Sequence, residues 1–464
     1  MQSRQRSKVA IKFGIKLVQS GARARAIAQL ISAQVETTLL RSCLALPKLL
    51  YVLRTCPPDH ITHATRQFDS IMREALESIV SSRITDWSWQ KASLPSNRGG
   101  LNLRSAVLHA PAAFISSAAS TKTLVERILN RPTNLDTYLE KAVSALSSSS
   151  SHPEWLNLDD IDIPLRQRHL SCAIDEAMYQ NLLDTSPSTR ARALANSSAL
   201  PHAGDWLNGV PSDVLGLHMQ DKEFNSCLKY WLGIPLHSAP HLCPACRTSA
   251  DEYGDHQVGC GGNGDRITRH NAVRDVIFSA AQSAVLGPSR EAQGLIPESL
   301  SRPADVFLPT WQGGRPAALD VHVISPLQQT LIHEAAFSPG HALEVGVRRK
   351  LTTHLQACRS IGVNFIPIVA ETLGGLGEEA INIIGAIGNA IDRRVTMTHS
   401  TSSTKKHLFH RLAIALWRGN TCLWLHFNYS LLKSCFYQYL YNYAIKHFPC
   451  GSPIIIAHLG LSPT

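Results

Sequence analysis

The segment Arg302–Pro326, RPADVFLPTWQGGRPAALDVHVISP, contains two short apolar runs separated by a Gly-Gly turn. Each run has the length and composition of a strand, with Asp305 just before the first run and Asp320 within the second. Because side chains alternate along a strand, we expect Asp320 and His322 to face one side and the neighbouring valines the other. Two adjacent strands of this kind can bring the two aspartates together.

Two converging carboxylates repel each other unless a cation lies between them, and Mg²⁺ prefers such oxygen ligands. Downstream, residues 341–362, HALEVGVRRKLTTHLQACRSIG, predict a helix with Lys350 and His354 one turn apart on one face. Lys350 could offer positive charge to an attacked phosphate or position the attacking water. The sequence therefore predicts Asp305, Asp320 and Lys350 as catalytic residues, with the two aspartates also binding Mg²⁺.

Each of these residues also has a possible structural role. For any one residue considered alone, that structural role is favoured over the catalytic one. An aspartate at a strand end is usually a cap, Lys350 could belong to a solvated basic face, and His322 could be a hydrogen-bonded core histidine. Glu291 could add a third carboxylate, although a surface position is favoured for it. A buried strand predicted over 363–372, VNFIPIVAET, carries Glu371 at its end.

The segment Cys243–Cys260, CPACRTSADEYGDHQVGC, has the spacing of a small metal-binding knuckle. Zn²⁺ prefers four nitrogen and sulfur ligands in a tetrahedron, and four protein ligands leave no open position. We therefore predict a structural zinc site whose ligands are Cys243, Cys246, His256 and Cys260. Asp251, Gly254 and Asp255 suit the intervening turn, and His270 is a less favoured alternative ligand.

A predicted helix follows the knuckle, DRITRHNAVRDVIFSAAQSA over 265–284, with Arg266, Arg269, His270 and Arg274 forming a basic face. Arg269 and His270 are predicted to contact nucleic acid on this face. Lys8, Lys12 and Lys16 recur every four residues and form a second predicted nucleic-acid-binding stripe near the start of the chain. A solvated helix face remains the alternative for each lysine.

The composition of the whole chain agrees with a folded protein that has a polyanionic partner. The 464 residues carry a net charge of +10, and the length suggests two or three domains. The eleven cysteines are odd in number and scattered through a long chain, which is not the pattern of a disulfide framework. No run of about 18 apolar residues is present, so no membrane role is expected. The first 125 residues have helical periodicity, and the serine run Ser147–Ser151 predicts a linker.

Taken together, these motifs resemble the C-terminal part of a non-LTR retrotransposon polyprotein that carries a restriction-like endonuclease. Residues 46–58, LPKLLYVLRTCPP, and 94–117 resemble the polymerase thumb and the region after it. The Cys/His segment resembles the family's CCHC knuckle, with the last spacing one residue shorter than usual. RPAD, LDVHV and Lys350 resemble the PD-(D/E)xK nuclease motifs, and RLAIALWRGN over 411–420 resembles a terminal helix.

The resemblance implies a multidomain α+β chain: a helical thumb-like N-terminal region, a small zinc knuckle and an α/β restriction-endonuclease-like core. The implied boundaries are 1–125 for the thumb-like region, 126–240 for a helical linker region, 241–265 for the knuckle, 266–395 for the nuclease, and 396–464 for a terminal helix and divergent tail.

The function that the resemblance implies is Mg²⁺-dependent cleavage of target DNA for insertion, with structural Zn²⁺ and with DNA and the element RNA as partners. The resemblance implies a nuclear location, and a cytoplasmic one is the alternative. Two departures accompany it: His322 stands where many such nucleases carry lysine, and His354 stands where a tyrosine is usual. No Tyr/Phe-x-Asp-Asp motif occurs in the chain, so no polymerase activity is expected. The alternatives are a non-catalytic nucleic-acid-binding remnant of a retroelement and an ordinary zinc-stabilised structural protein.

Overall fold

The computed structural model describes residues 32–147, 166–297, 302–395 and 404–425. The longer helices of its N-terminal half are α2 (Ala33–Leu39), α3 (Leu50–Thr55), α4 (Pro58–Val80), α5 (Asp86–Ser93), α6 (Ala106–Leu129), α7 (Leu135–Ser147), α8 (Arg166–Asp184), α9 (Thr189–Ser198) and α10 (Asp221–Trp231). The remaining elements are β1 (His241–Leu242), β2 (Ser249–Ala250), α11 (Asp255–Gly259), α12 (Asp265–Ser283), β3 (Ser289–Arg290), β4 (Val306–Leu308), β5 (Ala317–Ile324), α13 (Ile332–Phe337), α14 (His341–Ser360), β6 (Asn364–Glu371), α15 (Glu378–Val395) and a helix over 404–425.

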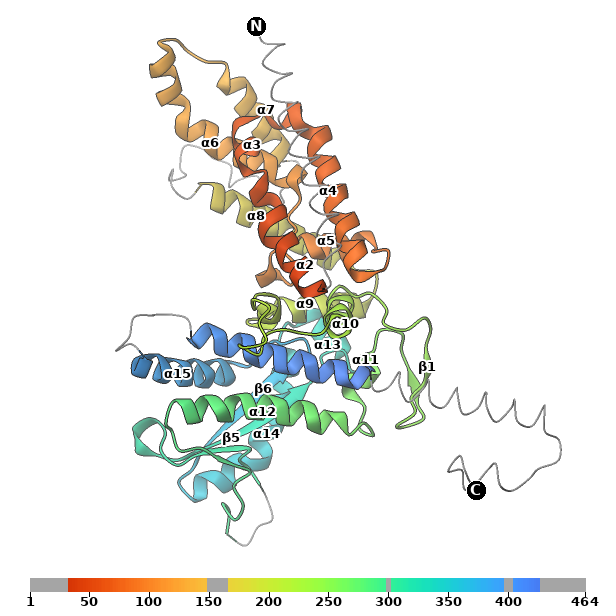
Figure 1. Cartoon of the computed structure of the whole chain (residues 1–464), viewed down its shortest axis with the longest axis vertical. Coiled ribbons are helices and arrows are strands. Elements are labelled where there is room, and N and C mark those ends of the chain that lie inside the picture. The colour runs from red at the N-terminus through yellow and green to blue at the C-terminus, as the bar shows by residue number, and fades with distance from the viewer. Residues whose placement is uncertain (1–31, 148–165, 298–301, 396–403, 426–464) are drawn as a thin grey trace, which may run out of the picture.

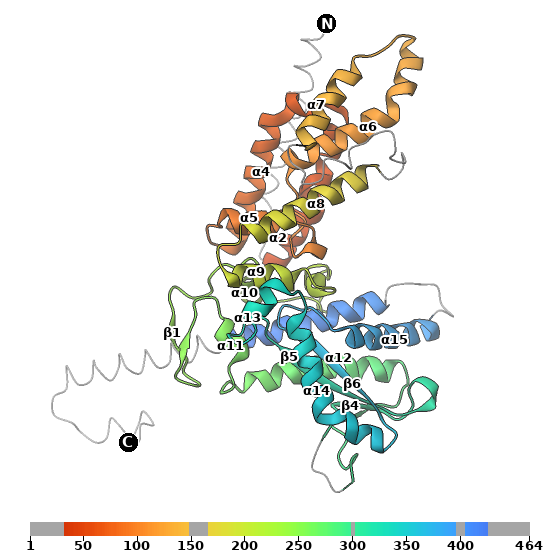
Figure 2. The same ribbon diagram turned by 180° about the vertical axis from the view of Figure 1, so that it is seen from behind.

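The helices from α2 to α8 form an elongated body at one end of the molecule, as the helical periodicity predicted (Figures 1 and 2). A tight turn closed by the hydrogen bond from the Gly100 N–H to the Pro95 carbonyl precedes α6. A Cβ atom on Gly100 would lie only 1.9 Å from the carbonyl oxygen of Leu94, so this turn requires glycine. The expected lysine stripe at Lys8, Lys12 and Lys16 lies outside the described residues, as does the serine linker beyond Ser147.

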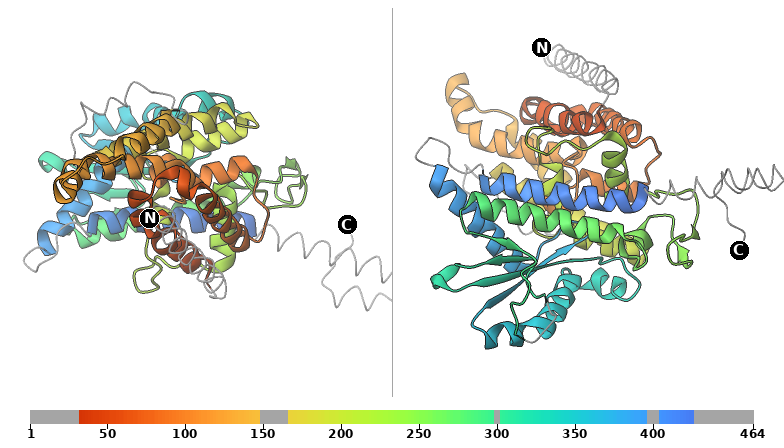
Figure 3. Two further views of the ribbon diagram at one scale, coloured as in Figure 1. Left: turned by 90° about the horizontal axis from the view of Figure 1, so that it is seen from above. Right: turned by 60° about the horizontal axis from the view of Figure 1, so that its bottom comes forward.

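A four-stranded sheet with the order β3-β4-β5-β6 forms the centre of the other end. Strands β3, β4 and β5 pair antiparallel, whereas β5 and β6 pair in parallel. Helices α12, α15 and 404–425 cover one face, where Val321, Ile368 and Leu412 share a core, and α14 covers the other (Figure 3). The parallel pair is buried on both faces, which accounts for the continuous apolar run of β6.

The helix over 404–425 connects the two ends of the molecule. Its Trp417 packs against Trp206 with ring centroids 4.7 Å apart, and its Trp424 packs against Tyr230 at 4.8 Å, all in a core shared with helices α3, α4 and α6. Leu412 and Leu416 of the same helix belong to the core on the sheet. The 404–425 helix is therefore part of both cores.

The architecture is mixed α+β and mostly helical, with small sheets. Within the described residues, no helix combines the length and the apolarity that crossing a membrane demands.

Candidate active site and metal centre

The four predicted knuckle residues converge in space. The ligand atoms of Cys243, Cys246, His256 and Cys260 all lie within 4.8 Å of one another. The Sγ atoms of Cys243 and Cys260 are 3.7 Å apart, and His256 Nε2 lies 3.3 Å from Cys246 Sγ. A tetrahedral ion with metal–sulfur bonds of about 2.3 Å separates its ligands by about 3.8 Å. The cluster can therefore bind a metal ion such as zinc.

The turn between the two ligand pairs is organised by Asp251. Its carboxylate accepts hydrogen bonds from the backbone N–H groups of four residues at 2.8–3.0 Å, Tyr253, Gly254, Asp255 and His256. These contacts fix the start of α11 and thereby orient His256 toward the cysteines. Hydrogen bonds with Thr248 lower the pKa of Cys246 to about 6, which favours the metal-binding thiolate.

The cluster is anchored to the rest of the molecule by two contacts. Asp255 forms a bidentate ion pair with Arg190, at 2.5 and 2.8 Å, and the indole Nε1 of Trp424 donates to the carbonyl of Gly254 at 3.1 Å. The turn role predicted for Asp251 is thus confirmed, whereas Asp255 is the first residue of α11 and pairs with Arg190.

The second site is positioned by the pairing register of strands β4 and β5. Val306 lies opposite Leu319, so Asp305, one residue earlier, comes beside Asp320, close enough for the charge of Asp305 to raise the pKa of Asp320. The ladder between β4 and β5 ends at this point. The Val321 N–H, beyond its end, donates to Asp305 Oδ2 at 2.7 Å.

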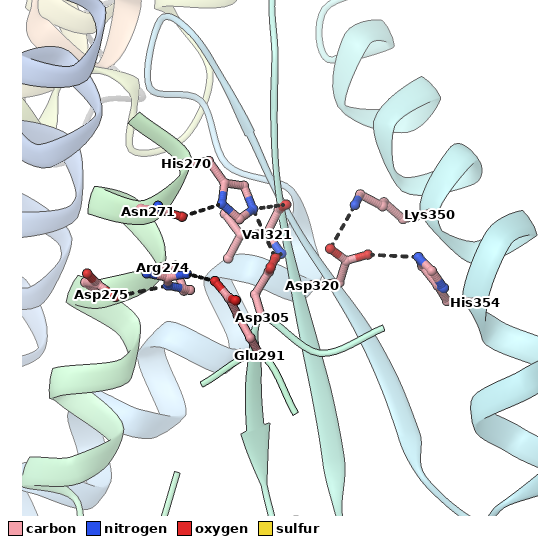
Figure 4. Close-up of polar contacts among 10 residues, drawn as sticks. All are labelled: His270, Asn271, Arg274, Asp275, Glu291, Asp305, Asp320, Val321, Lys350 and His354. Carbon is pink, nitrogen blue, oxygen red and sulfur yellow. Dashed lines mark hydrogen bonds and ion pairs between the residues drawn. The ribbon is translucent and has the colours of Figure 1, made fainter. Parts of the chain in front are cut away.

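His270 of α12 reaches the same point from the other side of Asp305 (Figure 4). Its Nε2 lies 3.1 Å from Asp305 Oδ2 and 3.1 Å from the carbonyl oxygen of Val321. Its Nδ1 lies 3.4 Å from Asn271 Oδ1. His270 is therefore part of the carboxylate site, and its alternative assignment as a knuckle ligand is wrong.

Lys350 approaches Asp320 from α14. Its Nζ lies 2.8 Å from Asp320 Oδ1, while His354 Nε2 lies 3.7 Å from Asp320 Oδ2 (Figure 4). The approach depends on Gly346, one turn earlier on the helix. A Cβ atom there would come within 2.7 Å of Val369 Cγ1, so only glycine lets α14 pack this closely on the sheet.

The electrostatic environments of the two aspartates differ. Burial raises the pKa of Asp320 to about 6, and Lys350 only partly offsets that effect. Burial opposes ionisation of Asp305 too, but the hydrogen bond and charge of His270 outweigh it and lower the pKa of Asp305. Burial and the charge of Lys350 lower the pKa of His322 to about 4, so His322 is neutral near pH 7.

The basic face predicted on α12 needs correction. Arg269 is only 3% exposed and donates to Asn420 Oδ1 at 2.9 Å, so it cannot contact nucleic acid. Arg274 is also buried, where it pairs with Glu291 and Asp275. Helical spacing identified the arginines, but the packing of the 404–425 helix against this side of α12 could not be foreseen. Arg266 alone of the predicted arginines is exposed.

The two additional glutamates lie apart from the carboxylate pair. Glu291 is paired with Arg274, and its side chain is about half exposed. Glu371 lies four residues beyond Pro367, the parallel-strand partner of Asp320, which places it about 13 Å along the sheet. It is fully buried, and burial raises its pKa to about 8.

Neither a protein-family model nor a curated protein matches the chain.

Proposed function

We propose that the chain is a metal-dependent DNA endonuclease, the nuclease portion of a protein resembling those of non-LTR retroelements. The observation that carries the proposal is the convergence of Asp305, Asp320 and Lys350 from a strand end, a central strand and a covering helix. Two neighbouring carboxylates, one of them 2.8 Å from a lysine ammonium, match the groups that metal-assisted phosphodiester hydrolysis requires.

The donor set suits Mg²⁺, because Asp305 and Asp320 offer carboxylate oxygens and Asp320 Oδ2 is buried without a hydrogen-bond donor. A divalent cation at such a pair lowers the pKa of a bound water and stabilises the leaving oxygen. Lys350 would orient the attacking water or neutralise charge that develops on the phosphate. Its contact with Asp320 holds the ammonium beside the proposed reaction centre.

DNA is the proposed substrate because the chain is strongly basic and exposed arginines flank the carboxylates. Arg266 on α12 and Arg349 on α14 are exposed, and both lie near enough to act electrostatically on His322. The Cys/His cluster would add a zinc-stabilised lobe upstream of α12. Nuclear location and the element RNA as a second partner belong to the same proposal through the family resemblance.

A non-catalytic nucleic-acid-binding remnant is the competing function. The net charge and the metal cluster would serve binding and cleavage equally well. The buried contact between Asp320 and Lys350 favours cleavage. Burying a carboxylate is destabilising, and a surface that only binds DNA does not require a buried carboxylate.

Nicking of supercoiled plasmid DNA in Mg²⁺ separates the two functions. The wild-type chain is expected to nick the plasmid, and Asp320→Ala is expected to abolish nicking while DNA binding persists. Glu334→Ala, which removes an exposed carboxylate, is the matched control and should nick like wild type. Equal nicking by wild type and Asp320→Ala, or none by either, would reject the endonuclease.

A further inference from the structure

Side chains take over from the strand pairing where the ladder between β4 and β5 ends. The ladder pairs Val306–Leu308 with Ala317–Leu319, so Val321 of β5 lies beyond it. The Val321 N–H donates to Asp305 Oδ2 at 2.7 Å, and the Val321 carbonyl oxygen lies 3.1 Å from His270 Nε2 (Figure 4). Val321 is only 1% exposed, so both of its backbone groups need such partners.

We propose that His270 is a positioning residue, whose Nε2–H donates to both Asp305 Oδ2 and the Val321 carbonyl and thereby fixes the Asp305 carboxylate beside Asp320. This inference rests on the proposed function, because it assigns a further residue to the same carboxylate site. His270 acts through Asp305 and contacts neither the cation nor the DNA.

The neighbours of Nε2 identify this atom as a donor. It lies 3.1 Å from Asp305 Oδ2 and 3.1 Å from the Val321 carbonyl oxygen. A carbonyl and an ionised carboxylate only accept hydrogen bonds, so the ring nitrogen between them carries the proton. One N–H shared between two acceptors is a three-centre hydrogen bond, and here it ties α12 to β5 and to the residue before β4.

The Asp305 carboxylate is thus held by donors from two separate elements. Val321 N–H reaches Oδ2 from β5, and His270 reaches the same oxygen from α12. The main chain of Asp305 is held as well, because the Glu291 N–H donates to its carbonyl oxygen at 3.0 Å. Partners of this kind fix the orientation of a metal-binding carboxylate, and the loss of one typically costs about 10- to 100-fold in metal affinity or activity.

Binding of Mn²⁺, which shares the preference of Mg²⁺ for carboxylate oxygens, tests the proposal without measuring cleavage. Full-length protein carrying zinc is titrated with Mn²⁺, and electron paramagnetic resonance measures the ion that stays free. His270→Phe keeps a ring but removes the donor, and it is expected to bind Mn²⁺ about tenfold more weakly than wild type. His270→Gln carries an amide N–H close to the Nε2 position and is expected to recover most of the affinity.

His333→Phe, which replaces an exposed histidine of α13, is the matched control and should bind Mn²⁺ like wild type. The melting temperature of each variant is recorded beside its affinity. A lower melting temperature with unchanged Mn²⁺ affinity in His270→Phe would show a merely structural role and overturn the proposal. His270→Gln binding as weakly as His270→Phe would overturn it too. If His270→Phe does not fold, His270→Asn replaces it, because its shorter amide ends before the Nε2 position.

Plasmid nicking by the same samples distinguishes this inference from the proposed function. Wild type that binds Mn²⁺ without nicking DNA would reject the endonuclease, and the affinities of the His270 variants would still decide the positioning role. Nicking by wild type with equal Mn²⁺ affinity in His270→Phe would reject the positioning role alone. Wild type that binds no Mn²⁺ beyond the zinc cluster would overturn both.

Discussion

The metal cluster and the carboxylate site differ in how the chain assembles them. All four cluster ligands come from one segment of 18 residues, held in place by local hydrogen bonds to Asp251. The carboxylate site combines α12, the end of β4, the middle of β5 and α14, which are far apart in sequence. The ligands of the metal cluster can therefore be predicted from their spacing in the sequence. The carboxylate site forms only when the strand register and the helix packing are fixed.

Loss of the metal cluster is expected to give the largest effect on stability. Cys243→Ser removes one ligand, and structural zinc contributes on the order of 10 kcal/mol of binding free energy to the fold around it. Because Trp424 and Arg190 join the cluster to the main core, we expect lower zinc content and a lower melting temperature of the whole chain.

Elemental analysis and thermal unfolding measure both effects. Cys172→Ser, which removes an exposed free cysteine, is the control. Full zinc occupancy in Cys243→Ser would show that the four residues do not act as one site.

Disturbing the helix that carries Lys350 is expected to affect activity more than stability. In Gly346→Val, the new side chain meets Val369 and pushes α14 away from the sheet. We expect the nicking rate to fall about 100-fold, as for a misplacement of about 1 Å, and stability to fall by about 1–3 kcal/mol. Gln356→Ala, an exposed change on the same helix, should alter neither property. An unchanged nicking rate in Gly346→Val would separate Lys350 from the chemistry.

The two neighbouring arginines of α12 are expected to respond in opposite ways. Arg269→Ala leaves Asn420 without its buried partner and should cost roughly 1–3 kcal/mol of stability, with no change in the salt dependence of DNA binding. Arg266→Ala should preserve stability and reduce the slope of binding against salt by about 1. Denaturant unfolding measures the stability of both variants, and binding titrations at several salt concentrations measure their salt dependence. A smaller salt dependence with unchanged stability in Arg269→Ala would show that Arg269 contacts DNA.

Glu371 gives the smallest expected effect, and it depends on pH. Its pKa is raised to about 8 in the folded chain, so between about pH 5 and 8 the unfolded chain releases a proton that the folded chain retains. Stability is therefore lost as pH rises through this range, by at most about 1.4 kcal/mol per pH unit. Glu371→Gln should remove this slope and the exposed control Glu379→Gln should keep it, as measured by unfolding at pH 6 and 7. Parallel curves for wild type and Glu371→Gln would contradict the prediction.

The sequence predicted the parts of the two sites that depend on local spacing. The cluster of Cys243, Cys246, His256 and Cys260 followed from short spacings, and the pairing of Asp305 with Asp320 followed from two strands around one turn. The burial of Arg269 could not be foreseen, because it depends on a helix that begins more than 130 residues later. The approach of His270 to Asp305 likewise depends on how α12 packs beside the sheet, which no pattern within α12 specifies.

The central claim is that Asp305, Asp320 and Lys350 act as one catalytic unit. Its most direct test is the single-turnover rate of Mg²⁺-dependent DNA cleavage by Asp305→Asn, Asp320→Asn, Lys350→Met and the triple variant, all with full zinc content. Residues that act together lose function non-additively, so each aspartate substitution should cost about as much rate as the triple variant. A rate that survives either aspartate substitution, or losses that add up across the three residues, would contradict the claim.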